Sequence, residues 1–330
     1  MSTLLLALLF LFLALHSYRE YWRLRTLPQL HHGEFTGELI KVGATYMARR
    51  PARNGCLHSI ICFPGFLEDM RYFQDLYKDE DAELILVNNA NYHCPFLKQG
   101  VITNVSRLDW PENPYPVGTI EYDAFYLGLT LQRLVSGREV FLHGHSRGAA
   151  VVLETGRQYP EVTGSKERPI RAVLEAPVLP QARTAGNGSD PLPYRIRCYF
   201  LPIFFGRMRN ISTERLLKLT LMRPTNRLKT ELLKSIFSTT RSYATCVINF
   251  KSIVTWQRGM GFEVYDNFPL LTVIVGERDT TLDGPSTLAS AEQGQMRNQS
   301  LSIIKTVNTN HFISLEQPES IRTILNLQQN

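Results

Sequence analysis

Cysteine is scarce in this chain of 330 residues, and the five cysteines lie far apart. They form no CxxC pair, and no group of His and Cys has the spacing of a zinc site. This absence argues against a metal site and against a disulfide framework. An odd number of scattered cysteines is typical of free thiols in a reducing compartment. The residues are Cys56, Cys62, Cys94, Cys198 and Cys246.

Internal repeats and low-complexity tracts are also absent, and glycine and proline occur at ordinary frequency. Repeat architectures and long disordered segments are therefore excluded. Hydrophobic residues make up 44% of the chain, which is sufficient for a sizeable core at this length. We expect one large domain with an inserted segment, or two domains of modest size.

Basic residues are missing before the one long apolar run, Leu4–Leu15. A secretory signal usually begins with basic residues, and a membrane-spanning helix needs about 17–25 apolar residues, more than this run contains. Arg19, Arg23 and Arg25 follow the run, and by the positive-inside tendency they place the rest of the chain in the cytoplasm. We predict that residues 1–25 form a short membrane anchor or an interfacial helix. A helix packed on the protein's own surface or on a partner, and a cleaved export signal, remain alternatives.

Apolar segments of strand type alternate with segments of helical periodicity along most of the chain. The expected strands cover residues 35–43, 59–66, 82–88, 138–144, 170–177, 270–279 and 301–308. The expected helices cover residues 68–78, 119–135, 147–159 and 314–328. Because the strands are apolar along their length, the pattern predicts an α/β fold with a mostly parallel central sheet and helices on both faces.

The alternation stops after residue 177 and resumes at residue 270. The intervening segment begins with turn-forming residues and continues with short helical patterns. An insertion of this size above a parallel sheet would cover it as a cap. We therefore divide the chain beyond the anchor into a helical cap, residues 183–261, and two core segments, residues 26–182 and 262–330.

Positive charge is concentrated in the predicted cap. Between Arg183 and Arg258 the chain has fourteen Lys and Arg residues and three acidic residues, whereas the whole protein carries a net charge of only +6. Such a basic surface can lie against anionic lipid headgroups or attract a phosphorylated substrate, although a generic solvated surface would have the same composition. No known nucleic-acid-binding module accompanies the charge, so we expect no nucleic-acid partner.

The sequence Gly144-His145-Ser146-Arg147-Gly148 fits the pattern G-x-S-x-G between an expected strand and an expected helix. In this context a sharp turn presents the serine above the edge of the sheet, and the flanking residues must be small to avoid the adjacent strand and helix. The amides at the start of the helix point toward the same position, where they stabilise negative charge. Ser146 is therefore the candidate nucleophile.

A serine nucleophile needs a base and an orienting acid, and after a turn of this kind they follow in the order serine, acid, histidine. His311 is the only histidine after Ser146, and it precedes the last expected helix. Asp279 follows a buried strand and is the candidate acid. Glu175, at the end of another strand, and Asp283 are alternatives that the sequence leaves open.

Acyl transfer at a serine also needs donors for the oxyanion that forms. The backbone N–H of Arg147, directly after the nucleophile, is one candidate. The other is the N–H of Phe66, in the turn after an expected strand, where Gly65 permits a close backbone approach; Leu67 is the next choice. The two histidines just before Ser146 are not candidates for the base, because the turn directs their side chains away from the serine.

These motifs together resemble the α/β-hydrolase superfamily. The matching segments are Phe-Pro-Gly-Phe after an early strand, Gly-His-Ser-Arg-Gly-Ala, Val-Gly-Glu-Arg-Asp, and Asn-His-Phe before the closing helix. The resemblance covers residues 35–327 apart from the cap. It implies the α/β-hydrolase fold and a serine hydrolase without a cofactor, in which Ser146, Asp279 and His311 form the triad and a helical cap shapes substrate choice. Many family members have His-Gly in the first motif, so we expect no close tie to the common lipase branch, whereas the oxyanion hole, which uses backbone groups, is unaffected.

The expected function is that of a membrane-associated serine hydrolase of the esterase or lipase kind, which cleaves a carboxylic ester of a lipophilic acyl substrate through an acyl-enzyme on Ser146. We expect two partners, a small acyl substrate and a membrane surface that residues 1–25 and the basic cap contact. The apolar run at residues 198–205 would line an acyl tunnel, enter the bilayer or form the cap's own core. An acyl thioesterase or acyltransferase of the same fold, and a non-catalytic binding protein, are the alternatives.

Overall fold

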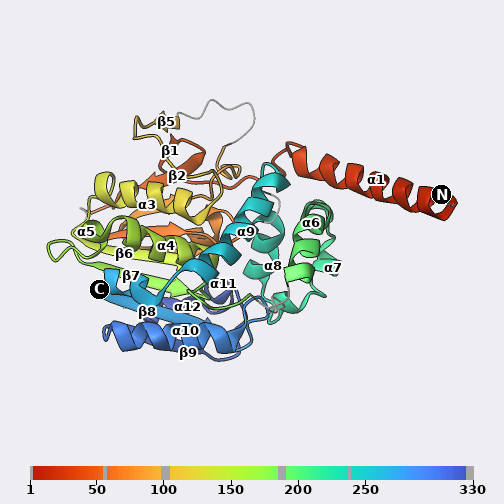
Figure 1. Cartoon of the computed structure of the whole chain (residues 1–330). Helices are drawn as coiled ribbons and strands as arrows, with labels where there is room; N and C mark the ends of the chain where they lie inside the picture. Colours follow the sequence, from red (N-terminus) through yellow and green to blue (C-terminus); the bar gives the residue numbers. More distant parts are fainter. Residues whose placement is uncertain (1–2, 55–57, 98–104, 185–190, 237–238, 325–330) are drawn as a thin grey trace.

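The computed structural model describes residues 3–54, 58–97, 105–184, 191–236 and 239–324, and Figure 1 shows their arrangement. This part of the chain forms one nine-stranded sheet with the strand order β5-β1-β2-β4-β3-β6-β7-β8-β9. Neighbouring strands are parallel from β4 through β3 to β9, whereas β2 is antiparallel to both β1 and β4. The predicted α/β fold with a mostly parallel sheet is confirmed. The strands are β1 (Glu38–Val42), β2 (Thr45–Arg50), β3 (His58–Phe63), β4 (Glu83–Val87), β5 (Val105–Arg107), β6 (Glu139–His145), β7 (Ile170–Glu175), β8 (Leu270–Gly276) and β9 (Leu301–Thr306).

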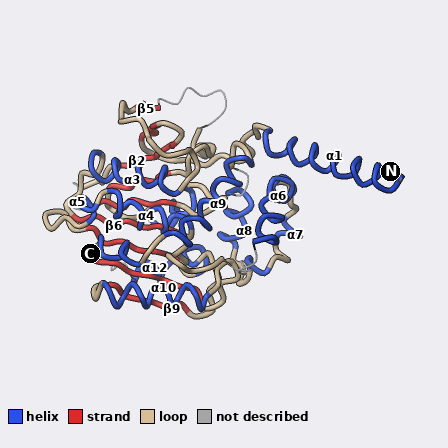
Figure 2. Tube along the Cα trace, viewed as in Figure 1, coloured by secondary structure: helices blue, strands red, loops and turns tan. Residues whose placement is uncertain are grey.

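Helices cover both faces of the sheet, as the sequence predicts (Figure 2). Side chains alternate between the faces along each strand, so that in β3 Ile61 and Phe63 join one buried cluster while Ile60 and Cys62 join the other. The first cluster includes residues of α3 (Ile120–Arg133), α4 (Arg147–Gln158), α5 (Pro160–Thr163), η3 (Phe262–Asn267) and α10 (Gly284–Arg297). The second includes residues of η1 (Met70–Phe73), α2 (Gln74–Tyr77), α11 (Ile313–Glu316) and α12 (Pro318–Ile324).

Some elements differ from those that the sequence pattern predicts. Strands β2 and β5 and helix α10 have no counterpart in the prediction, and η1 followed by α2 replaces one helix expected at residues 68–78. The helix expected at residues 314–328 is divided between α11 and α12. The division falls before Pro318, because proline has no N–H to continue the hydrogen bonds of α11. Residues 325–328 lie outside the described residues.

In the segment predicted as a cap, residues 183–261, the described residues form helices joined by loops, with isolated bridges at Thr184 and Thr240. It contains α6 (Pro191–Met208), α7 (Thr213–Leu216), η2 (Thr220–Met222), α8 (Arg227–Ile236) and α9 (Tyr243–Gly259). These helices gather at one end of the sheet, and α1 (Thr3–Leu24) extends away from the same end (Figure 1). Helix α6 escaped prediction because Pro202 lies inside it and apolar residues occur all round it. The domain boundaries themselves stay a prediction.

Candidate active site

The chain turns sharply between β6 and α4, where Ser146 lies. Ser146 has φ 52° and ψ −115°, a backbone conformation that residues other than glycine rarely adopt. Its N–H donates to the carbonyl of Glu175 over 2.8 Å, which holds the turn against β7. A Cβ on Gly148 would lie 2.1 Å from the carbonyl oxygen of Phe63, so only glycine fits beside the adjacent strand. The strand, turn and helix expected from the G-x-S-x-G pattern are thus present.

A chain of hydrogen bonds joins the three residues that the sequence nominates as nucleophile, base and acid. His311 Nε2 lies 2.9 Å from Ser146 Oγ, and His311 Nδ1 lies 2.8 Å from Asp279 Oδ2. All three side chains are buried or nearly so. They come from the turn after β6, the loop after β8 and the loop after β9, and these loops lie at the carboxyl end of neighbouring parallel strands.

Asp279 is held as an anion that orients the imidazole. Burial alone would raise its pKa, but His311 and the backbone amides of Leu282 and Thr281 outweigh burial and lower the pKa below its ordinary value. The amide hydrogen bonds measure 3.0 Å and 2.7 Å. A carboxylate opposite Nδ1 selects the tautomer with its proton on Nδ1, which leaves Nε2 free to accept the hydroxyl proton of Ser146.

The two alternative acids have other partners. Glu175 accepts hydrogen bonds from Tyr72 Oη (2.8 Å) and from the amide and hydroxyl of Ser314 (both 2.6 Å), and it lies 3.0 Å from His143 Nε2. Burial alone would raise the pKa of Glu175, but His143 and these other neighbours lower it to about 2. Asp283 caps the first turn of α10. Of the three carboxylates that the sequence left open, Asp279 is therefore the one that contacts His311.

The candidate oxyanion donors flank Ser146 on two sides. Arg147 is the first residue of α4, so its N–H has no acceptor within the helix. In the turn after β3, the N–H of Leu67 already donates to Tyr92 Oη (3.3 Å), which leaves the N–H of Phe66 as the donor of this turn. Their role as an oxyanion hole stays a prediction.

The side chain of Arg147 fixes the start of α4, a function that the sequence did not indicate. Its guanidinium is fully buried, lies 2.7 Å from Asp123 of α3 and donates to Asn89 Oδ1 over 2.7 Å. Burial raises the pKa of Asp123, and the ion pair with Arg147 offsets part of this rise. The sequence feature that could have indicated this function is the position of Arg147, a charged residue directly after the serine in an otherwise apolar helix start.

A buried ion pair beneath the site also escaped prediction. His145 Nδ1 donates to Glu68 Oε2 over 2.8 Å, and its Nε2 donates to the carbonyl oxygen of His311 over 2.9 Å. Glu68 Oε2 also accepts from the N–H of Gly65, again over 2.8 Å. Burial alone would lower the pKa of His145, but Glu68 and other neighbours raise it to about 9, so the imidazole is a cation at neutral pH. The pair thereby links the turn after β3, the turn that presents Ser146 and the loop that carries His311.

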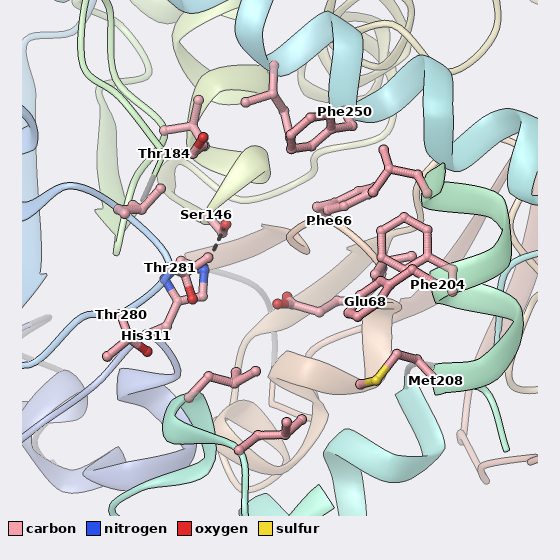
Figure 3. A pocket seen from close by; sticks show the side chains of 18 of the residues that line it. Phe66, Glu68, Ser146, Thr184, Phe204, Met208, Phe250, Thr280, Thr281 and His311 are labelled. Carbon is pink, nitrogen blue, oxygen red and sulfur yellow. Dashed lines mark hydrogen bonds between the residues drawn. The ribbon is translucent and has the colours of Figure 1, made fainter. Parts of the chain in front are cut away.

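Ser146 and His311 open onto a cavity of about 690 Å³ (Figure 3). This volume is within the range of pockets that hold small-molecule ligands. The core contributes Phe66 and Leu282, and the cap contributes side chains from α6 and α9, so both parts of the chain enclose the same space. Among the described residues that line it, Glu68 is the one with an acidic side chain. The apolar lining residues are Phe66, Leu67, Val178, Phe200, Leu201, Phe204, Phe205, Met208, Leu219, Leu221, Phe250, Ile253, Leu282 and Phe312.

Cysteine offers no competing nucleophile among the described residues. Cys62, Cys94, Cys198 and Cys246 are buried free thiols, and Cys56 lies outside the described residues. Burial raises the pKa of Cys62 well above its ordinary range and that of Cys94 and Cys246 to about 12, so these thiols stay protonated near neutral pH. In the same part of the chain, no group of three His, Cys, Asp or Glu side chains is arranged to hold a metal ion.

Comparison with known proteins gives the class that this fold and site define. The profile of the alpha/beta hydrolase family matches residues 60–322, which is most of the chain. The chain belongs to the alpha/beta hydrolase family. No curated protein sequence matches it.

Solved structures of hydrolases share the fold at low sequence identity. A thermophilic esterase from Thermogutta terrifontis matches with a TM-score of 0.55 and 14% identity, over 86% of this chain and 92% of that chain. An esterase from a Rhodococcus species matches with a TM-score of 0.56 and 15% identity, over 88% and 96%. A hydrolase from Oleispira antarctica matches with a TM-score of 0.57 and 12% identity, over 86% and 94%. At this identity the likeness establishes the fold, so substrate and mechanism have to be argued from the chain's own residues.

Proposed function

We propose that this protein is a membrane-associated serine hydrolase that cleaves carboxylic esters of lipophilic acyl substrates through an acyl-enzyme on Ser146. The observation that carries the proposal is the hydrogen-bonded chain from Ser146 through His311 to Asp279, which opens onto an apolar cavity. A serine, an imidazole and a carboxylate in this order form the arrangement that activates a hydroxyl for acyl transfer.

Acylation begins when Ser146 Oγ attacks the carbonyl carbon of the ester. The hydroxyl proton passes to His311 Nε2 as the new C–O bond forms, and the carbonyl oxygen becomes an oxyanion that the amides of Phe66 and Arg147 stabilise. Asp279 stabilises the imidazolium through Nδ1. The tetrahedral intermediate then breaks its bond to the alcohol, which takes the proton from His311 Nε2 and leaves.

Deacylation repeats these steps with water. His311 Nε2 takes a proton from the water as its oxygen attacks the acyl carbon, and the same two amides stabilise the second oxyanion. The bond to Ser146 Oγ then breaks, the serine recovers its proton from His311, and the free acid leaves. No other group has to supply or remove electrons, so the three side chains and two amides complete the cycle.

The lining of the cavity supports a lipophilic acyl group. Phenylalanine and aliphatic side chains surround the space next to Ser146, so an acyl chain there exchanges water for apolar contacts. Helix α1 supports membrane association because it is long and apolar enough to cross a membrane. The arginines after its apolar run support a cytoplasmic catalytic domain, by the positive-inside tendency.

Hydrolysis of p-nitrophenyl esters of graded acyl length tests the proposed function. We expect the wild type to hydrolyse the series with kcat/KM rising from acetyl to medium chains, by up to about fourfold for each buried CH₂ group. Ser146→Ala should hydrolyse none of them above background. A folded wild-type protein that turns over no member of the series would contradict the proposal and would favour a non-catalytic binding protein.

Thioester cleavage or acyl transfer is a second candidate, and the basic cap favours it. Arg197 lines the cavity and is exposed on α6, where it could attract the phosphates of a carrier such as coenzyme A. Parallel assays with p-nitrophenyl and coenzyme A esters of one acyl chain separate the reactions. A kcat/KM at least tenfold higher for the thioester would identify a thioesterase, and product esters formed from an added alcohol would identify an acyltransferase.

The ion pair of Glu68 and His145 should affect turnover through charge as well as position. A Cβ built on Gly65 would lie 2.8 Å from Glu68 Oε2 and 2.9 Å from Ser146 Cβ. The carboxylate of Glu68 and the Cβ of Ser146 are therefore less than 6 Å from each other. A carboxylate this close to the oxyanion would destabilise it by charge repulsion. The positive charge of His145 offsets this repulsion. We expect His145→Gln to lower kcat about 10- to 100-fold, the scale of one uncompensated charge at this distance and an effective dielectric constant near 20. The double variant Glu68→Gln/His145→Gln should recover part of that loss.

Steady-state kinetics of His145→Gln and of the double variant check this expectation, with thermal unfolding to confirm that each is folded. A double variant that is no more active than His145→Gln would show that the pair acts only by holding the loops in place.

A further inference from the structure

Helix α6 exposes a stripe of large apolar side chains. Ile196, Phe200 and Phe204 follow at intervals of four residues, which places them along one face of the helix, and they are 49%, 38% and 55% exposed. Contiguous exposed apolar residues on a folded domain mark a surface that contacts something other than water. Phe200 and Phe204 also line the cavity next to Ser146. These two members of the stripe therefore lie at the outer margin of the cavity, whereas Ile196 lies outside it, and Figure 3 shows Phe204 facing the cavity from α6.

Helix α1 is docked against this same helix. His16 Nδ1 lies 3.0 Å from Tyr199 Oη, and Arg19 Nε donates to the carbonyl oxygen of Tyr199 over 2.8 Å. Trp22 packs against Gly206, where a Cβ would lie only 2.4 Å from the indole. These contacts hold the second half of α1 in one place relative to α6.

The docking sets the height of α6 relative to a membrane that contains the first half of α1. The apolar run of α1 ends at Leu15, and the leucine and phenylalanine side chains from Leu4 to Leu13 are each at least half exposed. His16 and Arg19, directly after the run, mark the level at which the helix leaves the hydrocarbon. Because both residues contact Tyr199, the turn of α6 that carries Ile196 and Phe200 lies near this level, and Phe204 lies toward Trp22.

The charge around the stripe suits an anionic lipid surface. Arg195, Arg197 and Arg207 are exposed on α6, at the two ends of the stripe and beside it. Arginine side chains at such positions place their charge among headgroups while apolar neighbours enter the acyl region. An exposed apolar stripe with flanking arginines is the composition of a helix that lies in a membrane interface.

We infer that the exposed stripe of α6 rests in the membrane beside α1, so that a lipid acyl chain passes from the bilayer between Phe200 and Phe204 to Ser146. The inference rests on the proposed function for its substrate, but the contact of α6 with lipid does not depend on catalysis. The substrate class is then an ester of a membrane lipid, presented by the bilayer itself.

Tryptophan fluorescence tests the membrane contact directly. The full chain is reconstituted into vesicles of phosphatidylcholine and phosphatidylserine, with and without lipids brominated in their acyl chains. We expect Ile196→Trp to show additional quenching by brominated lipid over the wild type. Met296→Trp, at a 67% exposed position on α10, is the matched control and should show none. Equal quenching of the two variants, or none in either, would overturn the inference whatever the enzyme's activity.

Kinetics with two presentations of ester test the route of the substrate. Ile196 does not line the cavity, so Ile196→Glu should leave hydrolysis of a water-soluble p-nitrophenyl ester unchanged. It should lower hydrolysis of a fluorogenic long-chain ester embedded in vesicles about tenfold, the scale of removing one large apolar side chain from lipid. Met296→Glu should change neither rate. If Ile196→Glu hydrolysed the embedded ester at the wild-type rate, the inference would be overturned. If the wild type did not hydrolyse the soluble ester at all, the proposed function would be overturned instead.

Discussion

Ser146→Ala and His311→Ala should each lower kcat for ester hydrolysis by about 10⁴- to 10⁶-fold, and the double variant should lose no more than either single variant. The reason is that in the proposed mechanism Ser146 Oγ acts as a nucleophile only while His311 Nε2, 2.9 Å away, takes its proton. Removing either partner removes the same step, so the two losses do not add. Single-turnover kinetics with a long-chain p-nitrophenyl ester measure the three variants on one scale.

Circular dichroism and thermal unfolding of the same samples provide the control. Ser146 has a strained backbone conformation, and alanine at this position keeps the Cβ, so we expect Ser146→Ala to be as stable as the wild type. A loss in His311→Ala that multiplies with the loss in Ser146→Ala would contradict a shared step. It would mean that the two side chains serve different functions.

Asp279→Asn should lower kcat by about 10³- to 10⁴-fold, because an amide opposite Nδ1 can hold the imidazole in the wrong tautomer. Its carboxylate lies 2.8 Å from His311 Nδ1 and has a lowered pKa, so in the wild type it is ionised across the neutral range. The matched control is Asp283→Asn, four residues on. Asp283 caps α10 and is paired with Arg183 at 3.5 Å, and asparagine is as good a cap as aspartate.

The pair of variants is compared by kcat at saturating ester and by the pH dependence of kcat/KM. We expect Asp283→Asn to keep wild-type turnover. A loss of activity in Asp283→Asn as large as the loss expected for Asp279→Asn would contradict the assignment of Asp279 as the orienting acid. The orientation of His311 would then depend on hydrogen bonds throughout the loop 279–283.

The sequence predicted a mostly parallel sheet, although not its strands β2 and β5, and it nominated the three residues that meet at the carboxyl edge of this sheet. It could do so because Ser146, Asp279 and His311 each lie on the turn or loop that follows a strand, and the carboxyl ends of parallel strands lie at one edge whatever the lengths between them. The choice between Asp279 and Glu175 was beyond the sequence. Glu175 ends one strand and Asp279 follows another, and only the path of the loops places Asp279 against His311 while Tyr72 and Ser314 surround Glu175.

Other features depend on partners that are distant along the chain. Glu68 and His145 are 77 residues apart, and nothing in the local pattern of either residue indicates a buried ion pair. Helix α6 owes its position to α9 and to Trp22 of α1 rather than to a periodic apolar face of its own. The exposed stripe cannot be recognised in the sequence, because exposed and buried apolar residues are adjacent there. In the structure Phe200 and Phe204 are exposed, whereas their neighbours Leu201 and Phe205 pack inward toward Tyr243.

Active-site labelling with a fluorophosphonate tests the central claim, that Ser146 is a nucleophile activated by His311. The probe phosphonylates an activated serine and releases fluoride. We expect peptide mass spectrometry of the labelled wild type to place the adduct on Ser146, with no adduct in Ser146→Ala and a much slower reaction in His311→Ala. Wild-type protein that stays unlabelled while folded, or an adduct on a different serine, would contradict the account.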